Sequence, residues 1–138
     1  MKIRRIFTIL SLFALVAIGV IMFNQRSGYR SISTGDAVHL IKTDTNVVLL
    51  DVRTPEEFSG ESGHLSGARL IPLQELEHRL EELNQVKQKK IIAYCRTGRR
   101  SANASILLAR HGFTVLNLEG GIVRWLQEGL PVVKGVEK

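Results

Sequence analysis

Two short, continuous apolar runs constrain the fold of this chain more than any other feature. Residues 46–53 read NVVLLDVR, and residues 89–94 read KKIIAY. Such runs are typical of strands covered on both faces of a parallel sheet, because a strand with one face in water alternates apolar and polar residues. Leucines at helical spacing follow in residues 73–83. Buried strands that alternate with helices indicate an α/β fold, a parallel sheet with helices on both faces.

Turn and cap residues divide the rest of the chain into elements of the same alternation. Thr34, Thr54 and Ser101 are expected to cap helices, and Pro55 suits a first helical position. The remaining expected elements are an edge strand at 31–33, a turn and short strand at 63–73, a helix at 73–86, a helix at 101–112, a strand at 113–118 and a helix at 120–129.

The only cysteine of the chain, Cys95, directly follows the second apolar run, and three arginines come within the next five residues. In open parallel sheets, ligands bind at the carboxyl ends of the strands. Gly98 permits a tight turn, so that backbone N–H groups and the N-terminus of the next helix can point at the sulfur. Such surroundings lower the pKa of a thiol, and the thiolate is the nucleophile. The arginines are suited to an anionic substrate.

An alternative interpretation treats Cys95 as a small buried apolar residue, which is common for a lone cysteine after a strand. Three arginines immediately downstream cannot be buried with it, and this favours a reactive thiol. A single cysteine also excludes an internal disulfide.

The net charge of +6 does not indicate a nucleic-acid partner. Residues 1–26 carry four of the 19 basic residues and none of the 13 acidic ones, so the remainder has a net charge of +2. Three of its basic residues lie in the loop after Cys95. No basic face therefore remains for a nucleic acid.

The N-terminus predicts a membrane anchor. Residues 6–23 form an uncharged, largely apolar run preceded by Lys2, Arg4 and Arg5. The run is long enough to cross the hydrocarbon core of a bilayer. A cleaved signal peptide is the alternative, but the best cleavage match, residues 17–19, lies inside the apolar run. A buried helix that is apolar on all sides would need a larger core than this chain offers.

Flanking charge predicts the orientation of this anchor. Three basic residues precede the run, whereas Arg26 and Arg30 follow it. The imbalance places the N-terminus inside and the domain outside the cell membrane, in the periplasm of a bacterium. Residues 1–30 are thus expected to form the anchor and linker, and residues 31–138 the soluble domain.

Four motifs together make the chain resemble a single-domain rhodanese, a member of the thiosulfate sulfurtransferase family. They are D-V-R-x-x-x-E-F from Asp51, G-H-L-x-G-A from Gly63, the six-residue loop from Cys95 to Arg100, and G-G-x-x-x-W from Gly120. The resemblance covers residues 31–134. It implies a five-stranded parallel sheet flanked by helices, and a cysteine that carries a sulfane sulfur as a persulfide.

Residue roles follow from the same resemblance. Cys95 matches the persulfide-forming cysteine, and the next five residues match the loop that holds the sulfur and the anion. These residues are Arg96, Thr97, Gly98, Arg99 and Arg100. Asp51, Arg53 and Ser101 are expected to support this loop, and Asp51 is expected to pair with one of its arginines. A helix cap or turn former remains the alternative for Asp51.

Two further motif residues are assigned to the structure and not to the chemistry. His64 is expected to be a satisfied core or loop residue, and Trp125 a core residue.

The reaction that the resemblance implies is ping-pong covalent catalysis without metal or organic cofactor. A small anionic sulfur donor such as thiosulfate loads Cys95, and cyanide, a thiol or a protein acceptor then takes the sulfur. Two rival functions remain. A cysteine phosphatase or arsenate reductase would need a longer C-x5-R loop, with an arginine six residues after the cysteine. This chain has Ser101 at that position. A membrane-tethered binding module would not need the cysteine and arginines that this chain retains.

Overall fold

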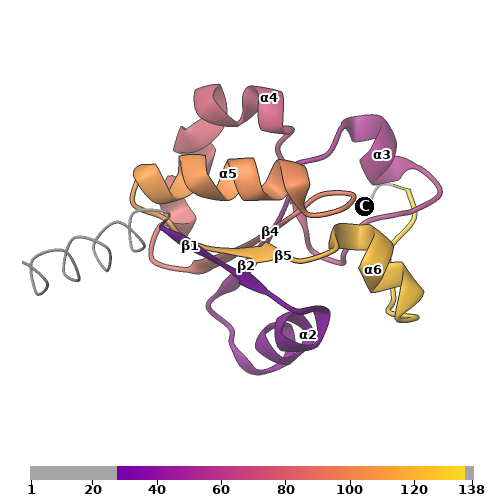
Figure 1. Cartoon of the computed structure of the whole chain (residues 1–138). Helices are drawn as coiled ribbons and strands as arrows, with labels where there is room; N and C mark the ends of the chain where they lie inside the picture. The colour runs from indigo at the N-terminus through magenta and orange to yellow at the C-terminus, as the bar shows by residue number, and fades with distance from the viewer. Residues whose placement is uncertain (1–27, 136–138) are drawn as a thin grey trace, which may run out of the picture.

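The structure of the chain, a computed structural model, describes residues 28–135 (Figure 1). Its centre is a five-stranded sheet in the order β1-β5-β4-β2-β3, and every paired strand runs parallel to its neighbour. The strands are β1 (Tyr29–Ile32), β2 (Val47–Asp51), β3 (Arg69–Leu70), β4 (Lys90–Tyr94) and β5 (Thr114–Leu118). The five-stranded parallel sheet expected from the sequence is confirmed.

Helices connect the strands and cover both faces of the sheet. They are α2 (Thr34–Thr43), α3 (Pro55–Ser59), α4 (Leu73–Leu76), the 3-10 helix η2 (Glu77–Val86), α5 (Arg99–Arg110) and α6 (Gly121–Gln127). Figure 1 shows α4 and α5 on one side of the sheet and α2 on the other. Parallel neighbours require such crossovers, since a tight hairpin cannot join them.

Two separate apolar cores explain why the interiors of β2 and β4 carry apolar residues on both faces. Ile91, Ala93 and Cys95 belong to the core beneath α4, η2 and α5. Ile92 and Tyr94 point the other way, into the core beneath α2 and α6. Successive side chains of a strand alternate between its faces, so a strand that separates two cores has no polar face. Cys95 therefore lies on the α5 side of the sheet.

Helix caps differ from two of the sequence predictions. The side chain of Ser33, and not of Thr34, caps α2 by accepting a hydrogen bond from the backbone N–H of Asp36. Ser101 does not cap α5, because Gly98 in a left-handed conformation turns the chain early and the helix begins at Arg99. The prediction for Thr54 is confirmed: it caps α3 in a reciprocal arrangement with Glu57, with Pro55 as the first helical residue.

The single helix predicted for residues 73–86 is also divided. A short α4 passes into the 3-10 helix η2, and Arg79 within η2 has a non-helical backbone with φ −115°. The Arg79 guanidinium pairs with Glu75 before this kink and with Glu82 after it. The leucine spacing located the segment correctly but did not reveal the break.

The predicted anchor at residues 6–23 lies outside the described residues. Within residues 28–135, no helix combines the length and the apolar character that are needed to cross a membrane.

Candidate active site

The segment from Cys95 to Arg100 leaves the carboxyl end of β4 and turns into α5. Its first two carbonyls are fixed by the start of α6: Ile122 N–H donates to Cys95 O at 2.9 Å, and Val123 N–H donates to Arg96 O at 3.1 Å. This close approach explains the glycine at position 121, where an added Cβ would lie 2.3 Å from Cys95 O. The G-G motif thus allows the start of α6 to pack closely against the loop.

The sulfur of Cys95 sits inside this loop with only 1% of the residue exposed. Gly98 N–H donates to Sγ at 3.1 Å, and the Ser101 hydroxyl lies 3.5 Å from it. Burial alone raises the pKa of the Cys95 thiol, but hydrogen bonds from the Ser101 hydroxyl and the loop amides outweigh it. The net pKa is therefore lowered from its ordinary value, which increases the thiolate fraction at neutral pH.

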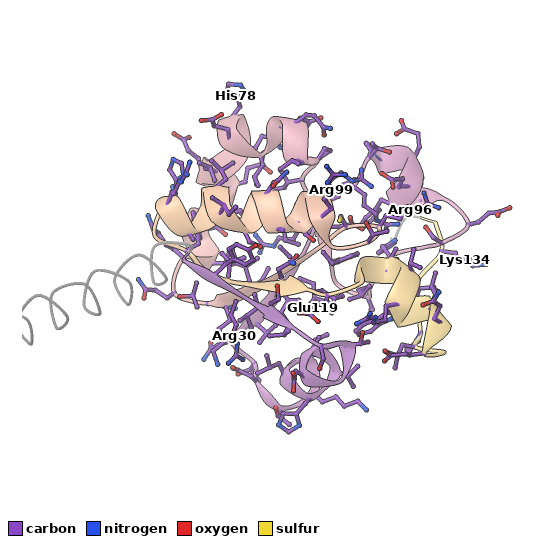
Figure 2. The ribbon with its side chains drawn as sticks, in the orientation of Figure 1. Arg30, His78, Arg96, Arg99, Glu119 and Lys134 are labelled. Atoms are coloured by element: carbon purple, nitrogen blue, oxygen red, sulfur yellow. The ribbon has the colours of Figure 1, made fainter. Side chains whose placement is uncertain are left out.

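The three arginines of the loop have different surroundings. Arg96 and Arg99 are exposed, and Figure 2 shows both beside the loop, near α3 and α6. Arg100 is half-buried and makes a two-pronged ion pair with Glu57, with N–O distances of 2.7 and 2.6 Å. The pair with Glu57, and beyond it the nearby Cys95 sulfur, raises the pKa of Arg100. The loop therefore has two exposed guanidinium groups and one that is fixed.

The expected pairing of Asp51 with a loop arginine is wrong, because Asp51 pairs with Arg53. Both side chains are buried, and Arg53 Nη2 lies 2.6 Å from Asp51 Oδ2. Arg53 also donates to Gly63 O at 2.7 Å and to Ser62 Oγ at 3.0 Å. The pair supports the end of β2 and the turn before β3, and does not contact the loop arginines.

His64 and Trp125 are structural, as expected. The His64 ring stacks on Phe58 at 3.7 Å between centroids, and its Nδ1 lies 3.0 Å from Phe58 O. The Trp125 indole packs in the core beneath α6 and donates to Pro131 O at 2.9 Å. Among residues 28–135, no group of three His, Cys, Asp or Glu side chains is placed to hold a metal ion.

Glu57 was not among the predicted site residues. It is the glutamate of the D-V-R-x-x-x-E-F motif, of which only Asp51 and Arg53 were expected to support the loop. Its ion pair with Arg100 is the main cause that lowers the pKa of Glu57 to about 2 from an ordinary value of 4.5. The link between α3 and the Cys95–Arg100 loop is therefore ionic at all but very acidic pH.

We expect Glu57→Gln to lower stability by an amount that depends on pH. Because the folded-state pKa is depressed, the contribution is fully present above about pH 4.5 and is lost as pH falls towards 2. Glutamine retains the reciprocal cap with Thr54, so mainly the charge is removed. Denaturant unfolding at several pH values should show the two proteins converge as the pH falls. The exposed residue Glu61, changed to Gln, is the control, and a pH-independent difference at position 57 would contradict the assignment.

The structure also reveals Asn117, a buried polar residue of β5. Ser101 Oγ donates to Asn117 Oδ1 at 2.7 Å, and Asn117 Nδ2 donates to Ser31 Oγ at 3.4 Å. The one sequence indication was a polar residue inside the apolar run FTVLNL. Ser101 thus lies between the Cys95 sulfur and this amide.

Together the fold and the loop define an α/β domain with a thiol held by backbone amides at the N-terminus of a helix. The chain belongs to the rhodanese-like domain family, whose model matches residues 34–128.

Sulfurtransferases are among the proteins to which the chain is similar. A sulfurtransferase of Allochromatium vinosum is 38% identical over 89 residues, which are 64% of this chain and 79% of that protein. A rhodanese-related protein from Thermoplasma volcanium is 37% identical, with a TM-score of 0.68 over 76% of this chain and 98% of that one. A polysulfide-sulfur transferase homodimer from Wolinella succinogenes is 28% identical, with a TM-score of 0.67 over 86% and 88% of the two chains.

Proposed function

We propose that the protein is a sulfurtransferase in which Cys95 accepts a sulfane sulfur from thiosulfate or a related donor and passes it to cyanide or a thiol. The observation that carries the proposal is the setting of the Cys95 sulfur: it receives a backbone N–H at 3.1 Å, and its pKa is lowered. Membership of the rhodanese-like family and similarity to known sulfurtransferases support the same chemistry.

The reaction has two displacement steps. The Cys95 thiolate attacks the terminal sulfur of thiosulfate, the bond to the sulfite sulfur breaks, and sulfite leaves with the electron pair. Cys95 then carries a persulfide anion. An acceptor such as cyanide attacks the outer sulfur, thiocyanate forms, and the Cys95 thiolate is regenerated. Each step transfers one sulfur atom and needs no oxidant or reductant.

The placement of charge supports the following roles for the loop residues. Arg96 and Arg99, both exposed, attract the anionic donor and hold its departing sulfite oxygens. Arg100, oriented by Glu57, supplies positive charge beside the sulfur. The backbone N–H groups of Thr97 and Gly98 donate to the Cys95 thiolate and, after the first step, to the persulfide anion.

The proposal is tested by incubating the protein with thiosulfate and measuring its intact mass. We expect a gain of one sulfur atom, removal of that mass by cyanide, and release of an equal amount of thiocyanate. A polysulfide, the donor named for the relative from Wolinella succinogenes, is the comparison. Loading by polysulfide alone would replace thiosulfate as the donor. Hydrolysis of an aryl phosphate without any mass gain would favour the phosphatase alternative.

The same assay tests the arginines. Arg96→Gln and Arg99→Gln should each raise the KM for thiosulfate. Rising salt should raise this KM more in the wild type than in either variant, because the variants have one charge fewer for the salt to screen. The exposed Arg110, at the far end of α5, is the matched control as Arg110→Gln. Equal salt dependence in all four proteins would contradict the anion-binding role.

We also propose, from the sequence alone, that residues 6–23 anchor the domain at the outer side of the cell membrane. Protease added to spheroplasts should then digest the domain. Protection until the cells are lysed would contradict this orientation.

A further inference from the structure

Asn117 and Ser101 are buried polar residues. The free energy lost when their polar groups leave water must be offset by the hydrogen bonds that they make. Their residue exposures are 5% and 0%. The neighbours of Asn117 in β5 are apolar, and an apolar residue of similar size would fit the pattern of the strand. If either side chain were buried without a hydrogen-bond partner, the folded state would be destabilised. The Ser101–Asn117 pair is therefore a candidate for a role beyond packing.

The Ser101 hydroxyl has one proton and two acceptors within reach. Asn117 Oδ1 lies 2.7 Å from Ser101 Oγ, and Cys95 Sγ lies 3.5 Å from the same oxygen. A hydroxyl can donate to only one of them at a time, and its lone pairs can accept a proton from the other. While Cys95 is a thiol, S–H can donate to Ser101 Oγ as the hydroxyl donates to Asn117. Once the sulfur is an anion, it needs the hydroxyl proton for itself.

We propose that Asn117 is a positioning residue that holds the Ser101 proton away from Cys95 until the sulfur becomes anionic, when the hydroxyl turns to donate to the sulfur. The thiolate that attacks the donor gains this hydrogen bond, and so does the thiolate that leaves in the second step. The role in the second step rests on the proposed sulfurtransferase function. Asn117 acts only through Ser101 and contacts no reacting atom.

The charged groups around the loop have other partners or are exposed, so Ser101 and Asn117 are the groups that control the proton beside Cys95. Arg100 is bound to Glu57 of α3, and Asp51 of β2 is bound to Arg53. Arg96 and Arg99 belong to the loop and its junction with α5, and Glu119, which follows β5, is exposed (Figure 2). These residues keep their charges in every variant below, so the neutral substitutions at positions 101 and 117 report the hydrogen bonds.

The test is the pH dependence of alkylation of Cys95 by iodoacetamide, which is unambiguous because the chain has a single cysteine. Ser101→Ala removes a donor to the thiolate, so it should raise the pKa of the thiol. Asn117→Leu frees the Ser101 proton for the sulfur, so it should lower that pKa. The scale of one hydrogen bond predicts a roughly three- to tenfold change in thiolate fraction for each variant.

The double variant Ser101→Ala/Asn117→Leu decides whether Asn117 acts through Ser101. Its thiol pKa should equal that of Ser101→Ala alone, since the residue through which Asn117 acts is gone. The same downward shift from Asn117→Leu in both backgrounds, or no shift in either, would overturn the proposal.

A second variant, Asn117→Asp, keeps the size of the side chain and makes it a stronger acceptor for the Ser101 proton, so it should shift the thiol pKa upward. Part of that shift should disappear in the Ser101→Ala background; an undiminished shift would mean that charge alone acts and would contradict the proposal. Alkylation requires no sulfur donor. A protein that shows these shifts but gains no mass with either thiosulfate or polysulfide would refute the proposed function and leave the positioning role intact.

Discussion

Replacing Cys95 by serine is expected to abolish sulfur transfer. Serine retains the approximate shape of the side chain, but its hydroxyl is not ionised at neutral pH and cannot carry a persulfide. Removal of a covalent nucleophile typically lowers kcat by about 10⁴-fold or more. Because Cys95 is the only cysteine, no second thiol can replace it. Thiocyanate formation and the mass gain with thiosulfate should both disappear.

A displaced thiol provides the control for this result. In the double variant Cys95→Ser/Ser59→Cys, the new cysteine stands on the exposed side of α3 without the loop amides. It should remain alkylatable but should not restore turnover. Thiocyanate formation at the wild-type rate by Cys95→Ser would show that the nucleophile has been misassigned.

The second large effect is expected on stability, from Arg53→Met. This change leaves the carboxylate of Asp51 buried, at 0% exposure, without its guanidinium partner. It also removes the donors to Gly63 O and Ser62 Oγ. Breaking a buried ion pair from one side typically costs about 3–5 kcal/mol. Denaturant unfolding should show a loss of this size in the free energy of unfolding.

Two comparisons separate burial from charge in this result. The double variant Asp51→Leu/Arg53→Met removes both ions, so it should be more stable than Arg53→Met alone. Arg79→Met breaks two ion pairs on the surface and should change the free energy of unfolding far less. If Arg53→Met and Arg79→Met behaved alike, the Asp51–Arg53 pair would not contribute as a buried pair.

The sequence was sufficient for the fold and for the position of the reactive thiol because both depend on local patterns. The apolar runs ending at Asp51 and Tyr94 identified buried strands, and the register pairs these two residues at the carboxyl ends of β2 and β4. Cys95 follows directly, so its place at that edge of the sheet could be predicted.

The partners of charged residues could not be predicted, because several were equally available from the sequence. Arg100 pairs with Glu57, which is 43 residues away, because the fold brings their side chains within hydrogen-bonding distance. Asp51 pairs with Arg53 and not with a loop arginine, since both side chains turn into the same buried space. Asn117 escaped notice because a single polar residue in a strand indicates no specific partner.

Helix starts were misplaced by one or two residues for a related reason. Ser33 and Thr34 offer the same hydroxyl, and only the backbone decides which one caps α2. At α5 the positive φ of Gly98 sets the start of the helix, so the helix includes Arg99 and Arg100 and their amides face the loop. Propensity alone does not determine this geometry.

The pairing of β1 with β5 has a consequence for the order in which the molecule can fold. Tyr29 pairs with Val115, so the first strand stays without a neighbour until the last strand is present. Contacts so distant in sequence form slowly, because a long loop must close before they are made. Asn117 and Gly121 come just as late in the chain. A ribosome-bound chain that stops before residue 113 therefore lacks the residues that bind the Cys95 and Arg96 carbonyls and the amide partner of Ser101.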